Sequence, residues 1–102
     1  MPNGTGQMFA KGKMHFVYVL LSLKDKRFYI GLSNNLTRRI KEHKYGKGQS
    51  TKGRRPLVLL YYEAHASQKD AKRREKYFKT SKGRTTLKQI LRDAIDNYVD
   101  IK

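Results

Sequence analysis

The sequence has no cysteine, few acidic residues and no long apolar run. The lack of cysteine excludes disulfides, zinc sites with thiolate ligands and cysteine nucleophiles. It is also compatible with a reducing compartment, so we expect a cytoplasmic protein. No segment approaches the roughly 20 apolar residues that a membrane-spanning helix needs, and the first residues lack the apolar stretch of a signal peptide.

The scarcity of acidic residues leaves a large positive charge. The chain carries 24 lysines and arginines against 8 aspartates and glutamates, a net charge of +16 that is divided equally between residues 1–50 and 51–102. A folded domain with this excess repels itself, and a polyanionic partner would explain it. Nucleic acid is the leading candidate. An acidic membrane surface is a lesser alternative, because it needs a basic amphipathic helix with bulky apolar anchors.

The length of 102 residues fits one domain with a modest core. Residues 1–13 contain three glycines and little apolar pattern, which is typical of a flexible leader. We therefore expect a single domain over residues 14–102.

The first half of the domain reads as a hairpin followed by a helix. Residues 15–22 are apolar on both faces, which predicts a central strand. A polar turn at 24–26 and a return strand over 27–32 predict antiparallel pairing. The serine and asparagines that follow are good N-caps, so we expect a helix over about 36–46.

The second half begins with a glycine-rich basic loop, 46–55, which we expect to be too polar to pack and suited to lie along phosphates. A third strand is predicted over 56–64, and a capping-box pattern predicts a helix over 68–80. An apolar stripe with helical period predicts one last helix from about residue 85. The order ββαβαα predicts an α+β fold, in which a three-stranded, mainly antiparallel sheet is flanked by helices.

Few side chains in this sequence suit hydrolytic chemistry. No GxSxG motif, Walker loop or histidine cluster with metal-ligand spacing is present. Tyr18 and Tyr29 lie on strands that we expect to pair, and the strand alternation places both on one face of the sheet. Arg39 follows ten residues after Tyr29, and His43 lies one helical turn further on.

These residues carry a resemblance to a known family. The motifs are Phe16-Val17-Tyr18, Tyr29-Ile30-Gly31, Arg39, His43 and Glu75, and the most specific stretch is FYIGLSNNLTRRIKEH. Over about residues 14–91 the chain resembles the GIY-YIG nuclease family, in particular small stand-alone bacterial proteins that are similar to excision-repair endonuclease domains. It is also similar to the nuclease domain of structure-specific resolvases. Phe16 replaces the glycine of the first motif and Leu32 replaces a lysine found in some members, while their later asparagine has no match here.

The resemblance implies a phosphodiester hydrolase, a metal-dependent DNA endonuclease of repair or recombination. The catalytic residues it implies are Tyr18, Tyr29, Arg39, His43 and Glu75. A guanidinium suits Arg39 to clamp phosphoryl oxygens as negative charge develops on them. The Glu75 carboxylate suits one hard divalent ion, Mg²⁺ or Mn²⁺, that assists the leaving oxygen.

The general base remains open between histidine and tyrosine. His43 has an unperturbed pKa of about 6.5, which matches neutral pH better than a tyrosine at about 10. A tyrosine also serves if the nearby Arg39 and a metal ion lower its pKa. Our hypothesis is that Tyr18 and Tyr29 position and activate water while His43 relays the proton.

The basic segments that flank these residues are expected to bind the DNA backbone without reading bases. The residues we expect in this role are Arg38, Lys41, Lys47, Lys52, Arg54, Arg55, Lys72, Arg73, Lys76 and Lys79. Ser50, Thr51 and Gly53 are expected to add neutral phosphate contacts. Any specificity should come from DNA structure, such as branches, nicks or flaps, or from a partner protein.

Each of these residues also has an ordinary structural interpretation. Tyrosines are common in strands, and Glu75 among lysines and arginines would normally form a surface ion pair. The main alternative function is a nucleic-acid-binding module, for DNA or RNA, that cleaves slowly or not at all. A scaffold or interaction domain is a third possibility, which leaves the charge of +16 unexplained. His15 and His65 are read as ordinary structural histidines.

Overall fold

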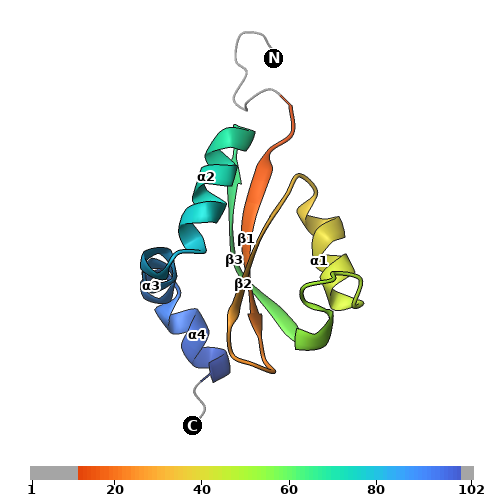
Figure 1. Cartoon of the computed structure of the whole chain (residues 1–102), viewed down its shortest axis with the longest axis vertical. Coiled ribbons are helices and arrows are strands. Elements are labelled where there is room, and N and C mark those ends of the chain that lie inside the picture. The colour runs from red at the N-terminus through yellow and green to blue at the C-terminus, as the bar shows by residue number, and fades with distance from the viewer. Residues whose placement is uncertain (1–11, 100–102) are drawn as a thin grey trace.

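The computed structural model describes residues 12–99. Most of the expected leader and the last three residues of the expected domain therefore lie outside the described residues. The elements are β1 (His15–Ser22), β2 (Phe28–Ser33), α1 (Leu36–Lys44), the 3₁₀ helix η1 (Lys52–Arg54), β3 (Leu57–His65), α2 (Gln68–Phe78), α3 (Ser81–Ile90) and α4 (Arg92–Val99). The predicted α+β class with a three-stranded antiparallel sheet is confirmed (Figure 1).

The sheet is built around β1, as the apolar pattern of that strand predicts. The strand order is β2-β1-β3, and β1 pairs antiparallel with both neighbours. In the β1–β2 register Tyr18 lies opposite Gly31 and Leu20 lies opposite Tyr29. Because side chains alternate along a strand, these four residues share one face of the sheet, and their neighbours share the other.

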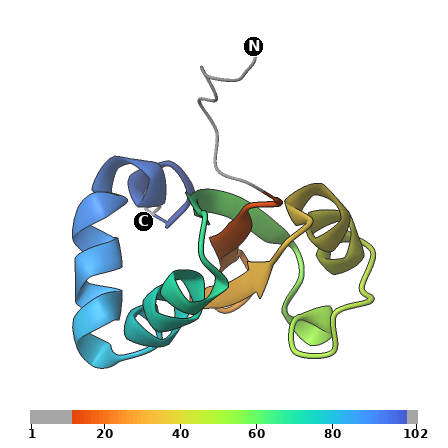
Figure 2. The same cartoon turned by 90° about the horizontal axis from the view of Figure 1, so that it is seen from above.

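Helices cover the two faces unequally. Figure 2 shows α2, α3 and α4 on one side of the sheet and α1 with the loop that follows it on the other. The main core lies on the α2 side. It is formed by Val17, Val19, Leu21, Phe28, Ile30, Ala71, Phe78, Leu87 and Leu91. The α1 side is therefore the face on which polar chemistry is placed.

The first two predicted helix starts are confirmed by their caps. The Asn35 side chain accepts a hydrogen bond from the Arg38 backbone N–H, and the Ser67 side chain accepts one from the Asp70 N–H. Each cap satisfies a backbone donor that the first helical turn leaves unpaired.

The prediction of one last helix is wrong. Helix α3 already begins at Ser81, with Thr80 as its cap, and the helix is interrupted at Leu91 before α4. Gly83 lies inside α3, at a point where a Cβ would collide with the Tyr77 carbonyl. The absence of a side chain at this position therefore allows α2 and α3 to approach closely. The break also changes the expected apolar stripe: Leu91 is buried, whereas Ile90 is largely exposed.

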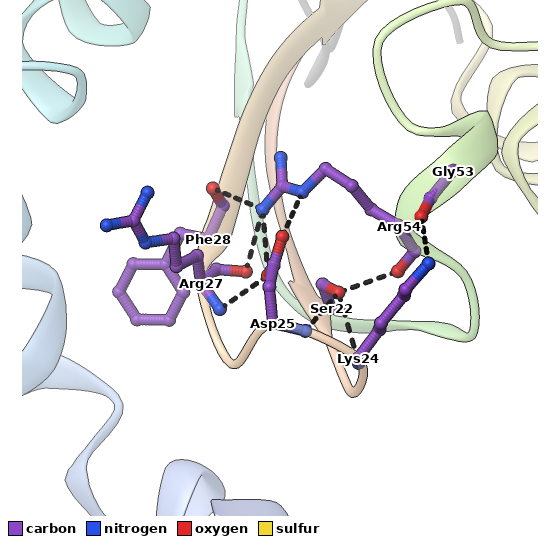
Figure 3. A network of polar contacts seen from close by, with 7 residues as sticks. All are labelled: Ser22, Lys24, Asp25, Arg27, Phe28, Gly53 and Arg54. Carbon is purple, nitrogen blue, oxygen red and sulfur yellow. Dashed lines mark hydrogen bonds and ion pairs between the residues drawn. The ribbon is translucent and has the colours of Figure 1, made fainter.

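The prediction that the glycine-rich basic loop is too polar to pack is also wrong. The loop contains η1, and it is fixed to the β1–β2 turn by polar contacts (Figure 3). Ser22 donates its hydroxyl to the Arg54 carbonyl at 2.6 Å, and Arg54 Nε donates to Asp25 at 2.7 Å. Two further bonds join the Arg54 guanidinium to the carbonyls of Arg27 and Phe28. The loop packs because the turn satisfies its polar groups.

Candidate active site

Tyr18 and Tyr29 meet on the α1 face of the sheet, as the strand alternation predicts. Their ring centroids are 6.3 Å apart. Tyr18 is fully buried and Tyr29 is partly exposed. The Tyr18 ring lies over Gly31, where an added Cβ would collide with the end of the ring. The glycine on β2 therefore makes the space that the first tyrosine occupies.

His43 projects from the last turn of α1 into these rings. It is buried, with a ring centroid 5.1 Å from that of Tyr29, and its Nε2 lies 2.8 Å from the Tyr18 hydroxyl oxygen. A histidine near the end of a basic helix is usually a surface residue, so the burial favours a specific role. The hydrogen bond is the most direct contact among the predicted site residues.

Thr51 completes this arrangement, whereas our prediction for it is a neutral contact with phosphate. Its Oγ1 lies 2.6 Å from His43 Nδ1, on the side of the ring opposite to Tyr18. The expected phosphate contact of Thr51 is wrong, because its side chain is fully buried. Gly48 permits the contact, since a Cβ there would lie 2.8 Å from His43 Nδ1 and 2.9 Å from Thr51 Oγ1. Tyr18, His43 and Thr51 thus form one buried chain of hydrogen bonds.

Burial controls the ionisation of this chain. Burial, followed by the nearby Tyr29, raises the pKa of Tyr18, although Arg39 acts in the opposite direction. Burial, followed by the charge of Arg39, lowers the pKa of His43, although Glu42 opposes this effect. Both side chains are therefore neutral near pH 7. The idea that Arg39 brings the pKa of Tyr18 toward neutrality does not hold in the protein without substrate.

The hydrogen-bond chain can run in either direction, depending on the tautomer of His43. If Nδ1 carries the proton, it donates to Thr51 and Nε2 accepts from the Tyr18 hydroxyl. If Nε2 carries the proton, Thr51 donates to Nδ1 and Tyr18 accepts from Nε2. Only the first direction makes His43 a proton acceptor for Tyr18.

Arg39 lies at the exposed rim of the cluster. Its Nη1 forms an ion pair of 2.8 Å with Glu42, three residues further along α1. Its charge acts on both Tyr18 and His43, and its side chain is still 29% exposed. The pair uses one donor and holds the guanidinium beside the tyrosines. A contact with Tyr18 engages a further part of the guanidinium, and the outer donors of the fork are available to an anion from solution.

Glu75 stands apart from the other four predicted residues. It projects from α2, and its carboxylate pairs with Lys79 at 3.2 Å. The neighbouring Arg74 pairs with Glu63 on β3, and α2 lies on the side of the sheet opposite to α1 (Figure 2). Within residues 12–99, no hydrogen bond joins Glu75 to the tyrosines, Arg39 or His43, and no cluster of three potential metal ligands is found.

The predicted DNA-binding cations mostly face solvent. Nine are exposed: Arg38, Lys41, Lys47, Lys52, Arg55, Lys72, Arg73, Lys76 and Lys79. Three of them, Arg38, Lys41 and Lys47, line a hollow of about 330 Å³ together with Glu42 and Tyr45. Arg54 is the exception: its guanidinium already bonds within the fold, so it has fewer donors left for phosphate.

Comparison with known proteins identifies the family. The model of the "GIY-YIG catalytic domain" matches residues 14–88, which is most of the chain. The chain belongs to the GIY-YIG family. This places it in the GIY-YIG nuclease superfamily, as its motifs predict.

Several bacterial proteins are similar to most of this chain. The UPF0213 protein SH2523 of Staphylococcus haemolyticus is 43% identical over 77 residues, which cover 74% of this chain and 93% of that protein. The UPF0213 protein CPE1444 of Clostridium perfringens is 43% identical over 67 residues, 65% and 71% of the two chains. The solution structure of the UPF0213 protein BH0048 of Bacillus halodurans matches with a TM-score of 0.52 and 32% identity, over 87% of this chain and 97% of that one.

The part of this GIY-YIG domain that the structure describes contains no helix long and apolar enough to cross a membrane. The candidate site is thus a buried Tyr-His-Thr chain with an arginine at its rim, on a small and strongly basic domain.

Proposed function

We propose that this GIY-YIG domain is a metal-dependent DNA endonuclease that hydrolyses phosphodiester bonds. The observation that supports this most directly is the buried contact between His43 and the Tyr18 hydroxyl, with Arg39 beside it. A neutral, desolvated histidine bonded to a tyrosine is suited to take up a proton near neutral pH. Simple DNA binding does not need such a group.

The first step is the activation of water. Of Tyr18 and Tyr29, only Tyr29 is partly exposed to solvent, so the Tyr29 hydroxyl orients the attacking water. The Tyr18 ring lies next to both Tyr29 and His43, and its hydroxyl, 2.8 Å from His43 Nε2, passes the proton to Nε2. Thr51 accepts from Nδ1 and holds the imidazole in the tautomer that this transfer needs. The relay fits the histidine-plus-tyrosine hypothesis.

The second requirement is stabilisation of the charge that develops on the phosphate. The Arg39 guanidinium has donors in a fork that matches two phosphoryl oxygens. The pair with Glu42 keeps this fork in place before substrate binds, which reduces the reorganisation needed in the transition state.

The third component is a divalent ion, for which Glu75 is the candidate ligand. A single carboxylate fits Mg²⁺ or Mn²⁺, since such ions are commonly held by one or two carboxylates, with water and substrate phosphate as the other ligands. When bound, the ion supplies Lewis-acid assistance to the leaving oxygen. Glu75 must exchange its contact with Lys79 for the ion, and the partial exposure of both side chains permits this.

The proposed substrate is DNA that is held through its backbone by the exposed cations. Selection would depend on DNA structure or on a partner protein, in repair or recombination in the cytoplasm. If about six phosphates are contacted, the logarithm of affinity should fall with the logarithm of salt concentration with a slope of about −5.

The test is cleavage of labelled linear duplex, flap and four-way-junction DNA with Mg²⁺, Mn²⁺ or EDTA. We expect metal-dependent cutting that is lost in Arg39→Ala and Glu75→Ala. Arg92→Ala and Asp96→Ala, both at exposed positions of α4, are controls with matched charge changes. Cutting that persists in EDTA, or in both site variants, would refute the proposal.

A second candidate is a nucleic-acid-binding module with weak or no cleavage, for DNA or RNA. The observation that favours it is the ion pair of Glu75 with Lys79, apart from the tyrosine cluster. Tight, salt-dependent binding without cutting of any substrate would support this function over the nuclease.

A further inference from the structure

A second basic cavity lies on the side of the sheet opposite to the tyrosine cluster. It has a volume of about 660 Å³ and lies between the β1–β2 turn and α3. Its lining residues are Asp25, Arg27, Phe28, Arg54, Arg84 and Lys88. None of these residues belongs to the proposed catalytic cluster, and only Arg54 was predicted to contact DNA.

The single carboxylate of the cavity is already neutralised. Asp25 is held by Arg54 Nε at 2.7 Å and Nη2 at 3.3 Å, and it accepts the Arg27 backbone N–H at 2.9 Å. The hydrogen bond from Arg54 is the largest cause of a low Asp25 pKa, about 2. Asp25 and Arg54 therefore cancel one another, and three cationic side chains remain.

These three, Arg27, Arg84 and Lys88, form no ion pair with any residue from 12 to 99. Arg84 and Lys88 lie four residues apart and so on one face of α3. Figure 3 shows the Arg27 guanidinium directed away from Asp25 and from the Arg54 network. Like charges that line one hollow repel each other, and a bound anion removes this cost.

We propose that this cavity binds backbone phosphates of a second segment of the same nucleic acid. Two guanidinium groups and an ammonium suit phosphodiester oxygens, which guanidinium binds in a bidentate manner. Phe28 is only 9% exposed, so it forms the floor of the cavity and is not an open stacking surface for a base. The inference rests on the proposed function for the identity of the partner.

The cavity and the tyrosine cluster lie on opposite faces of the sheet. Phe28 on β2 directs its side chain to the α2–α3 face, whereas Tyr29 directs its ring to the α1 face. DNA at the tyrosine cluster would reach the cavity only if it bends or branches around the hairpin. A branched substrate provides such a second arm, so the cavity should favour four-way junctions or flaps over linear duplex.

The experiment measures DNA binding in EDTA, so it does not depend on cleavage. Lys88→Gln and Arg84→Gln are compared with Lys82→Gln, which removes the same charge from a different face of α3. Fluorescence anisotropy is recorded with a four-way junction and a duplex of equal length. We expect each cavity variant to bind the junction about three- to tenfold more weakly, with a salt slope smaller by about 1, and the control to change little.

Two results would overturn the proposal. If Lys82→Gln weakens binding as much as Lys88→Gln, only the general charge matters. If neither cavity variant changes junction binding, the cavity does not contact DNA. Lys88 is exposed, so its replacement leaves the fold intact even if Arg84→Gln does not.

A titration with pyrophosphate distinguishes DNA from a small phosphorylated ligand. Pyrophosphate should change the amide chemical shifts of residues at the cavity. Reversal of these changes when junction DNA is added would support the proposal. Pyrophosphate binding that junction DNA does not displace would assign the cavity to a small ligand and overturn it. A protein that binds junctions through the cavity but never cuts them would refute only the proposed nuclease activity.

Discussion

Replacing Thr51 by valine should damage the candidate site through His43. Valine keeps the shape of threonine but removes the hydroxyl that lies 2.6 Å from His43 Nδ1. The two side chains are buried, so no water replaces the lost partner. An unsatisfied buried polar group costs about 1–3 kcal/mol, a noticeable part of the roughly 5–15 kcal/mol that stabilises a typical domain.

The same change should alter the state of the imidazole. In the wild-type protein we expect the Nδ1-protonated tautomer, which ¹⁵N spectra of the histidine ring report directly. In Thr51→Val we expect a mixture of tautomers, and cutting about tenfold slower or more, since about 1.4 kcal/mol corresponds to a factor of ten. Thr51→Ser keeps the hydroxyl and should restore both the tautomer and the rate.

Urea unfolding and the ring spectra together test this reasoning. In a His43→Ala background, Thr51→Val should cost little more, because the bond is already absent. If Thr51→Val leaves the His43 signals unchanged and the free energy of unfolding within about 0.5 kcal/mol, the hydrogen bond does not fix the ring. An Nε2-protonated ring in the wild-type protein would remove His43 as the proton acceptor for Tyr18, whatever the stability.

Three further changes have defined outcomes. The pKa of His43 is lower in the folded protein than in the unfolded chain, so below about pH 6.5 the unfolded chain binds more protons. The free energy of unfolding should therefore decrease as the pH falls from about 6.5 toward the folded pKa. His43→Gln should reduce this dependence on pH, which urea titrations at several pH values measure. In Gly31→Ala the new methyl group should collide with the Tyr18 ring, destabilise the protein by about 1–3 kcal/mol and abolish cutting. Gly53→Ala is the control and should do neither, because its Cβ meets nothing within 4 Å. Equal stability of the two variants would contradict the packing described. Glu75→Gln should abolish Mg²⁺-dependent cutting while leaving the His43 ring spectrum unchanged, and a changed spectrum would mean that Glu75 acts on the cluster itself.

The part of the site that the sequence predicts is the part that local periodicity controls. Tyr18 and Tyr29 are on one face because strand side chains alternate, and no tertiary information is needed for this. Arg39 and His43 are on neighbouring turns of α1 because they lie four residues apart. Such regular geometry is available from the sequence as soon as the elements are recognised.

Thr51 could not be found in this way. It lies in a segment whose composition indicates a solvated loop, and nothing nearby in sequence signals burial. Its role depends on a contact with a residue eight positions earlier, together with space that Gly48 provides. The early start of α3 was missed for a related reason: Gly83 suggests a helix end by local propensity, whereas tertiary packing against Tyr77 requires it inside the helix.

The loop between α1 and β3 is attached at two points only three residues apart. Thr51 is fastened to α1 through His43, and Arg54 is fastened to the β1–β2 turn through Asp25 and Ser22. Chain length within this short span is therefore fixed, because one extra residue would pull one attachment out of register. The same restriction extends back to Gly48, whose carbonyl accepts from the Thr51 and Lys52 N–H groups, so an inserted label should be placed outside residues 48–54 if the imidazole is to stay undisturbed.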